Sequence, residues 1–133
     1  MIPTSGNSAL LDTNAVIAFR GMTRSVTLNL RAYSDLAISA ITLGELFFGA
    51  QNSERREENL EELTRVIAGI EITPIESAVA AEYPVIRHEL KRRGLPIPPN
   101  DMWIAATARL HSMTLVTCDR HFHSVKGLSV LGW

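Results

Sequence analysis

The sequence of 133 residues contains only one cysteine, Cys118, so an intramolecular disulfide and a zinc site built on several cysteines are excluded. Lysine is also scarce, because Lys91 and Lys126 are the only two among 13 basic residues. The remaining arginines suit bidentate contacts with phosphate better than lysines would. The net charge of −1 argues against binding of nucleic acid through an overall positive charge, but it leaves a local basic surface open.

Long apolar runs are missing as well. No run approaches the roughly 20 residues that a helix needs to cross a bilayer, and residues 1–8 lack the basic and apolar segments of a signal peptide. The composition, 46% hydrophobic and 20% charged, is typical of a folded core rather than of disorder. We therefore expect one domain over residues 1–133, in a soluble protein of the cytoplasm with no membrane association.

Segments typical of strands alternate with segments at helical spacing along the whole chain. Strands are predicted at residues 8–11, 36–40, 71–74, 114–118 and 128–131. Helices are predicted at residues 13–19, 23–32, 42–50, 54–68, 76–93 and 101–111, with a short turn or helix at 120–125. This alternation predicts an α/β fold in which helices cover both faces of a parallel sheet.

Local signals mark several helix ends. Ser53 and Asn100 are predicted N-caps of the helices that follow them. Gly94 is expected to end the long helix at 76–93. Pro84 lies inside that helix and predicts a kink or a break there, because proline removes a backbone hydrogen bond.

Aspartate is scarce too, and three of the four aspartates stand where a strand ends or a helix begins. Asp12 and Asp119 each follow a predicted strand, and Asp101 opens a predicted helix. Glu45 lies one turn into the helix that follows strand 36–40. Because the carboxyl ends of parallel strands lie along one edge of the sheet, these four carboxylates are expected to converge.

Carboxylates that converge away from water repel one another unless a cation lies between them. Hard divalent cations such as Mg²⁺ take oxygen ligands, typically carboxylates and waters. Metal ions held in this way can activate a water and stabilise the leaving oxygen of a phosphodiester. The four acids therefore predict a metal site that acts on phosphate esters, with either one or two metal ions.

Each acid also has a purely structural explanation. Asp12 and Asp119 can cap the helices that follow them, and Asp101 can favour the first turn of its helix through the helix dipole. Thr42 and Glu45 match a capping box, in which the glutamate reaches back to the backbone of the cap. The shared placement of all four acids is what favours a functional site.

Four segments, in this order and at this spacing, resemble the PIN domain family of metal-dependent ribonucleases, and within it the VapC-type toxins of toxin–antitoxin pairs. These segments are residues 11–14, 39–46 with Gly49, 100–108, and 115–122 followed by 127–130. The resemblance implies a three-layer α/β/α sandwich with five parallel strands. It implies that RNA is cleaved with Mg²⁺ or Mn²⁺ bound at the four acids, supported by two further side chains: Asp12, Glu45, Asp101 and Asp119, with Asn14 and Thr117.

The resemblance also implies partners. Family members usually form homodimers and bind a small antitoxin protein that occludes the site. The helices at 42–50 and 54–68 would form the groove for the antitoxin. Phe47 and Phe48 are adjacent and cannot both face the core, so one of them is expected to be exposed to a partner.

Other residues near the acids have competing interpretations. His121 and His123 lie near Asp119, so contact with phosphate or metal is one interpretation, but ordinary surface or packing roles are favoured. Cys118 is interpreted as a small buried residue. Three arginines are candidates for contacts with the RNA backbone, although solvated loop arginines are the alternative for each: Arg20, Arg24 and Arg120.

Other functions stay open on the sequence alone. A housekeeping PIN-type ribonuclease would use the same chemistry as a toxin. A non-catalytic α/β regulatory module of the phospho-receiver kind would need a second acid after the first strand and a lysine at the end of a late strand, and Thr13 and Lys126 do not fit. A haloacid-type phosphatase would need an acid in place of Asn14. The RNA target is not determined by the sequence.

Overall fold

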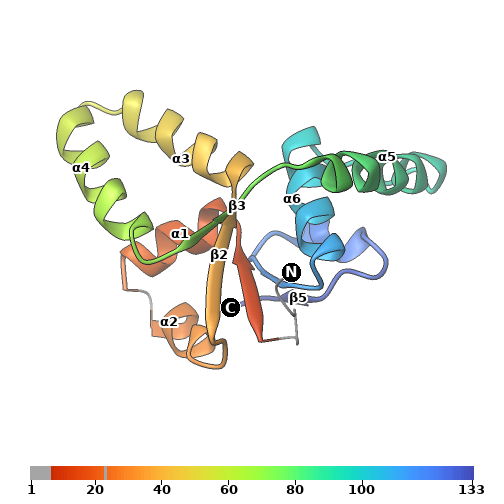
Figure 1. Cartoon of the computed structure of the whole chain (residues 1–133), viewed down its shortest axis with the longest axis horizontal. Helices are drawn as coiled ribbons and strands as arrows, with labels where there is room; N and C mark the ends of the chain where they lie inside the picture. Colours follow the sequence, from red (N-terminus) through yellow and green to blue (C-terminus); the bar gives the residue numbers. More distant parts are fainter. Residues whose placement is uncertain (1–6, 23) are drawn as a thin grey trace.

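A sheet of five parallel strands runs through the computed structural model, which describes residues 7–22 and 24–133 (Figure 1). The strand order is β3-β2-β1-β4-β5, and every neighbouring pair is parallel. The strands are β1 (Ser8–Leu11), β2 (Asp35–Ser39), β3 (Glu71–Thr73), β4 (Thr114–Val116) and β5 (Val130–Leu131). The predicted α/β fold with five parallel strands is confirmed.

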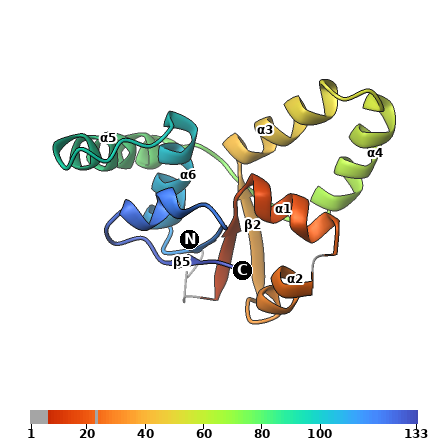
Figure 2. The same ribbon diagram turned by 180° about the vertical axis from the view of Figure 1, so that it is seen from behind.

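Helices cover both faces of this sheet (Figures 1 and 2). They are α1 (Thr13–Arg20), α2 (Arg24–Leu30), α3 (Ala40–Gln51), α4 (Arg56–Ile67), α5 (Ser77–Arg92), α6 (Pro99–Leu110) and the 3-10 helix η1 (Arg120–Ser124). On β1, Leu10 packs with residues of α5 and α6, whereas Ala9 and Leu11 pack with residues of α1 to α4. Side chains of a strand alternate between its faces, so β1 is buried on both sides and the fold is a three-layer sandwich.

Two helices begin earlier than the sequence predicted. Helix α3 follows β2 directly, because the Ser39 hydroxyl caps it by accepting from the Thr42 amide at 3.0 Å. Thr42 therefore lies in the first turn of α3, and the predicted capping box between Thr42 and Glu45 is wrong. Helix α6 begins at Pro99, and its first turn has no side-chain cap, so the prediction of Asn100 as the N-cap is also wrong. A proline suits the first helical position because its φ angle is already helical.

Helix α5 runs through Pro84 without a break. Pro84 is exposed, while Val79 and Ile86 on either side of it are buried in the core that α5 shares with α6. Packing of both flanks keeps the helix together, although the proline lacks an amide hydrogen. The end of α5 is as predicted: Gly94 has a φ of 68°, and the Leu95 amide donates back into the last turn of the helix.

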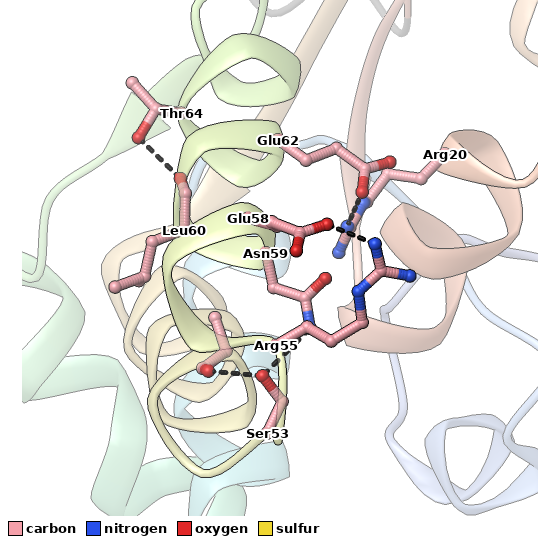
Figure 3. Close-up of polar contacts among 9 residues, drawn as sticks. Arg20, Ser53, Arg55, Glu58, Asn59, Leu60, Glu62 and Thr64 are labelled. Carbon is pink, nitrogen blue, oxygen red and sulfur yellow. Dashed lines mark hydrogen bonds and ion pairs between the residues drawn. The ribbon is translucent and has the colours of Figure 1, made fainter.

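The turn between α3 and α4 is built differently from the prediction. Ser53 does not cap α4: its hydroxyl donates to the Ala50 carbonyl at 2.7 Å and accepts from the Asn59 side chain at 2.9 Å (Figure 3). An ion pair of 3.0 Å between Arg20 of α1 and Glu62 fastens α4 to its neighbour (Figure 3). The α3–α4 pair is therefore held at its turn and along one side.

Two expectations concern residues that the structure does not describe. The predicted helix 23–32 began at Thr23, which lies outside the described residues, and α2 covers Arg24–Leu30. The signal-peptide argument used residues 1–8, and of these only Asn7 and Ser8 are described. Within the described ranges, no helix is both long enough and apolar enough to span a bilayer.

Candidate active site

The four acids line one cavity of about 240 Å³ at the carboxyl edge of the sheet. Asp12 follows β1, Glu45 lies on α3, Asp101 lies in the first turn of α6, and Asp119 begins η1 after β4. Thr13, Asn14 and Ile104 complete the lining. The structure thus brings together carboxylates that are far apart in the sequence, as the parallel topology predicts.

Asp12 is the most deeply buried of these acids, with 5% of its surface exposed. One carboxylate oxygen caps α1 by accepting from the Ala15 amide at 2.8 Å, and the other accepts from the Thr117 hydroxyl. Burial raises the pKa of Asp12, and the negative charges of Asp119 and Glu45 raise it further, against the two hydrogen bonds. Asp12 is therefore an N-cap, as the structural explanation held, and also a wall of the cavity.

Thr117 connects two of the acids. Its buried hydroxyl donates to Asp12 and accepts from the Asp119 amide at 2.9 Å. A single side chain thereby fixes the orientation of the Asp12 carboxylate and the path of the backbone at Asp119. The family resemblance implied a supporting part for Thr117, and this part stays a prediction.

Glu45 is held by Thr13 rather than by a capping box. The Thr13 hydroxyl donates to the Glu45 carboxylate at 2.7 Å across the gap between α1 and α3. Glu45 is partly buried, and its carboxylate is directed to the cavity that it lines. The bond from Thr13 was not apparent from the sequence, because the two residues lie 32 positions apart.

Asp101 has the pKa that departs most plainly from its ordinary value. Burial raises the pKa of Asp101 from 3.8 to about 6, and the charges of Asp119 and Glu45 contribute in the same direction. The helix dipole favours a charged acid in the first turn of α6, yet burial, together with the other carboxylates, raises the pKa of Asp101 despite this preference. A cation that enters the cavity would stabilise the charged form of Asp101.

Asp119 caps η1 and lies beside His121, a residue that the sequence interpretation assigned to an ordinary surface role. The Asp119 carboxylate accepts from the His121 amide at 2.9 Å and lies 3.0 Å from the imidazole Nδ1. Atoms that could bind a metal, one from each of Asp101, Asp119 and His121, all lie within 4.8 Å of one another. Only the path of η1 brings His121 to the acids. His123, two residues further on, does not join this group.

The remaining candidates are more scattered. Asn14 is exposed and lines the cavity. Arg20 is directed to Glu62 on α4 and does not line the cavity, whereas Arg24 and Arg120 are exposed and not part of its lining. Cys118 is exposed, so its interpretation as a buried packing residue is wrong.

The cavity has a strong excess of negative charge. Among the described residues, neither a lysine nor an arginine forms an ion pair with any of the four acids, and His121 is the basic side chain closest to Asp119. Oxygen donors that converge without a counter-charge are the ligand set that a divalent cation requires.

The sequence model of the PIN domain family matches residues 9–128. This match includes all four acids and spans most of the chain. The chain therefore belongs to the PIN domain family.

Several relatives carry the names of ribonucleases. The chain is 36% identical over 99 residues to the tRNA(fMet)-specific endonuclease VapC of Shigella flexneri, with 74% of this chain and 75% of that protein covered. It is 33% identical over 128 residues to Ribonuclease VapC2 of Haemophilus influenzae, with 93% and 96% covered. The resemblance to VapC-type proteins is confirmed.

Two solved structures of VapBC complexes are similar to this protein in fold. VapBC2 from Rickettsia felis, bound to a DNA fragment from its promoter, superimposes with a TM-score of 0.88 at 30% identity and covers 95% of this chain and 98% of that one. DNA-bound VapBC from Salmonella typhimurium gives a TM-score of 0.87 at 30% identity, with the same coverage.

Proposed function

We propose that this protein is a metal-dependent endoribonuclease that hydrolyses RNA phosphodiester bonds at the acidic cavity. The observation that carries the proposal is the convergence of four carboxylates from four separate elements on one cavity, with the pKa values of Asp12 and Asp101 raised. Structural capping explains part of the arrangement at Asp12 and Asp119, but it does not explain why Glu45 and Asp101 meet them. A cation shared by the four carboxylates explains why they meet, and the same cation would bind an anionic substrate.

The donor set fits Mg²⁺ or Mn²⁺. Both cations favour carboxylate oxygens and waters, and Asp12, Glu45, Asp101 and Asp119 would hold them, with His121 adding a nitrogen beside Asp119. When bound, such a cation supplies an activated water and charge stabilisation at the leaving oxygen.

The neighbouring residues orient the acids. Thr117 and the Ala15 amide fix the two oxygens of Asp12, and Thr13 fixes Glu45, so the carboxylates are preorganised before substrate arrives. We assign Asn14, exposed at the rim of the same cavity, to contact with the RNA or with metal-bound water. Arg24 and Arg120 are assigned to the RNA backbone, and Arg20 is not, because it is engaged by Glu62.

We further propose that the protein is the toxin of a toxin–antitoxin pair in the cytoplasm. Its likeness to VapC proteins over nearly their whole length and to structures of VapBC complexes supports this role over housekeeping RNA decay. The antitoxin would bind the groove of α3 and α4, where Phe47 and Phe48 are both exposed. A homodimer, which the family resemblance implies, is part of the proposal.

Incubation of the purified protein with total RNA tests the activity. We expect discrete cuts in the presence of Mg²⁺ or Mn²⁺ and none with EDTA, and the fragment ends would identify the target. Intact RNA after incubation with folded, metal-loaded protein that carries no antitoxin would contradict the proposal.

A further inference from the structure

A second cavity, of about 470 Å³, adjoins the acidic one. It lies between α3 and the first turn of α6, and its described lining is Ala40, Ile41, Gly44, Glu45, Phe48 and Asn100. Glu45 lines both cavities, so they lie on either side of one side chain. An RNA chain with a phosphodiester among the acids would therefore bring a neighbouring group to this second cavity.

The chemistry of the lining differs from that of the acidic cavity. Ile41, Phe48 and the helix surface at Gly44 are apolar, and the lining includes neither lysine nor arginine. Phe48 has 69% of its surface exposed, so its ring is available to a ligand. The exposed Asn100 amide adds one donor and one acceptor. Such a surface does not suit a phosphate, but it suits a flat group with hydrogen-bonding edges.

We propose that this cavity holds an unpaired nucleobase of the RNA next to the cleaved bond, with Phe48 as its stacking surface and Asn100 at its edge. Aromatic side chains stack readily on bases of single-stranded RNA, and an asparagine amide can pair with a base edge. The inference rests on the proposed ribonuclease activity, because the acidic cavity is what places the base. It directs the enzyme to single-stranded segments.

Two neighbouring phenylalanines give a matched pair of variants. Phe48 lines the cavity, whereas Phe47 is also exposed on α3 but does not line it. Binding would be measured by fluorescence anisotropy in the Asp101→Asn background with Mg²⁺, so that the RNA is not cut. The probes are a labelled 12-nucleotide oligouridylate and an abasic ribose-phosphate 12-mer of the same charge.

The background protein should bind the oligouridylate about fivefold or more tightly than the abasic chain, as stacking on an aromatic ring predicts. Adding Phe48→Ala should remove this preference, and adding Phe47→Ala should leave it. No preference in the background protein, or an unchanged preference with Phe48→Ala, overturns the base site.

Two glycines of α3 give an independent test. A Cβ added at Gly44 or at Gly49 meets no described atom within 4 Å, so alanine fits the fold at both positions and strengthens the helix. Only the methyl at Gly44 would enter the cavity. Gly44→Ala should weaken oligouridylate binding and leave abasic binding unchanged, and Gly49→Ala should change neither. Equal effects of the two substitutions would contradict the proposal.

Failure of this inference can be told apart from failure of the proposed function. Native protein that cuts RNA with metal but shows no Phe48-dependent base preference would refute the base site and leave the nuclease standing. Phe48-dependent base preference without any cutting by the native protein would refute the nuclease and leave a base-binding site.

Discussion

At the residue scale, Asp101 shows that the site lowers the stability of the metal-free fold. Its pKa of about 6 means that the folded protein holds this carboxylate against burial and against the negative charges of three neighbouring acids. In the unfolded chain the same group returns to its ordinary pKa of 3.8. Because the native state binds more protons between these two values, stability without metal falls as the pH rises from about 4 to about 6, and the unfavourable effect is fully present at pH 7.

Asp101→Asn should therefore stabilise the metal-free protein at pH 7. The amide removes a charge that the neighbouring acids repel, and it cannot titrate. Denaturant unfolding in EDTA, followed from pH 4 to pH 7, should show a higher midpoint at pH 7 and a smaller loss of stability with pH than in the native protein. A variant less stable than the native protein at pH 7 would mean that Asp101 stabilises the fold and is not held against repulsion.

Thr117 is the second residue whose role can be isolated. Thr117→Val keeps the shape of the side chain but removes the donor to Asp12 and the acceptor for the Asp119 amide. We expect a loss of roughly 2 kcal/mol in unfolding free energy, since one bond is to a buried charge, and a loss of about 10- to 100-fold in cleavage. Thr117→Ser keeps the hydroxyl and should retain most of the activity. Equal cleavage rates for the valine and serine variants would contradict the proposed role of the Thr117 hydroxyl.

At the element scale, α1 and α4 are joined by a contact that the sequence did not reveal. Arg20 was a candidate for the RNA backbone because it follows the Asp12 loop, but its guanidinium lies 3.0 Å from Glu62 and its side chain is only 22% exposed. The periodicity of α4 predicted a solvated charged face, and that pattern carries no information about which distant cation one of its glutamates meets.

Arg20 and Arg120 can be distinguished by salt dependence. Arg20→Ala should lower the unfolding free energy by about 0.5–1 kcal/mol, as a partly exposed ion pair does, and leave the salt dependence of RNA binding unchanged. Arg120→Ala should reduce the slope of log affinity against log salt by about one. Filter binding over a range of salt concentrations, with protein that cannot cleave the RNA, measures this slope for both variants. A reduced slope for Arg20→Ala would return Arg20 to the RNA surface.

Helix ends were the elements most often misplaced by sequence reasoning. Thr42 and Asn100 are good capping residues by type, yet Ser39 and the Pro98–Pro99 pair determine where α3 and α6 begin. Choosing among several capping residues depends on where the preceding strand or loop stops, which only the sheet register and the packing decide. The end of α5 was predictable because glycine adopts a positive φ more readily than other residues and so commonly ends helices. Gly94 indeed has a positive φ.

At the scale of the whole molecule, parallel topology explains why the acids were found. Alternating strands and helices predict that the loops after β1 and β4 share one edge of the sheet, and this is where Asp12 and Asp119 lie. His121 was missed because its approach to Asp119 depends on the course of η1. The hydroxyl bonds from Thr13 and Thr117 connect residues at least 32 positions apart, which no local pattern records.

The fourth aspartate provides the control for the central claim. Asp35 begins β2 and is exposed, so it stands at the opposite edge of the sheet from the acidic cavity. Asp35→Asn and Asp101→Asn make the same chemical change and remove the same charge from the molecule. Of these two aspartates, only Asp101 lines the acidic cavity.

The most direct measurement compares the single-turnover rates at which these two variants and the native protein cut RNA with Mg²⁺. Even residues that only support metal ligands cost 10- to 100-fold when they are removed, so Asp101→Asn should lose about 100-fold or more. Asp35→Asn should cut at the native rate. Cutting by Asp101→Asn at the rate of Asp35→Asn would show that the acidic cavity is not where RNA is hydrolysed.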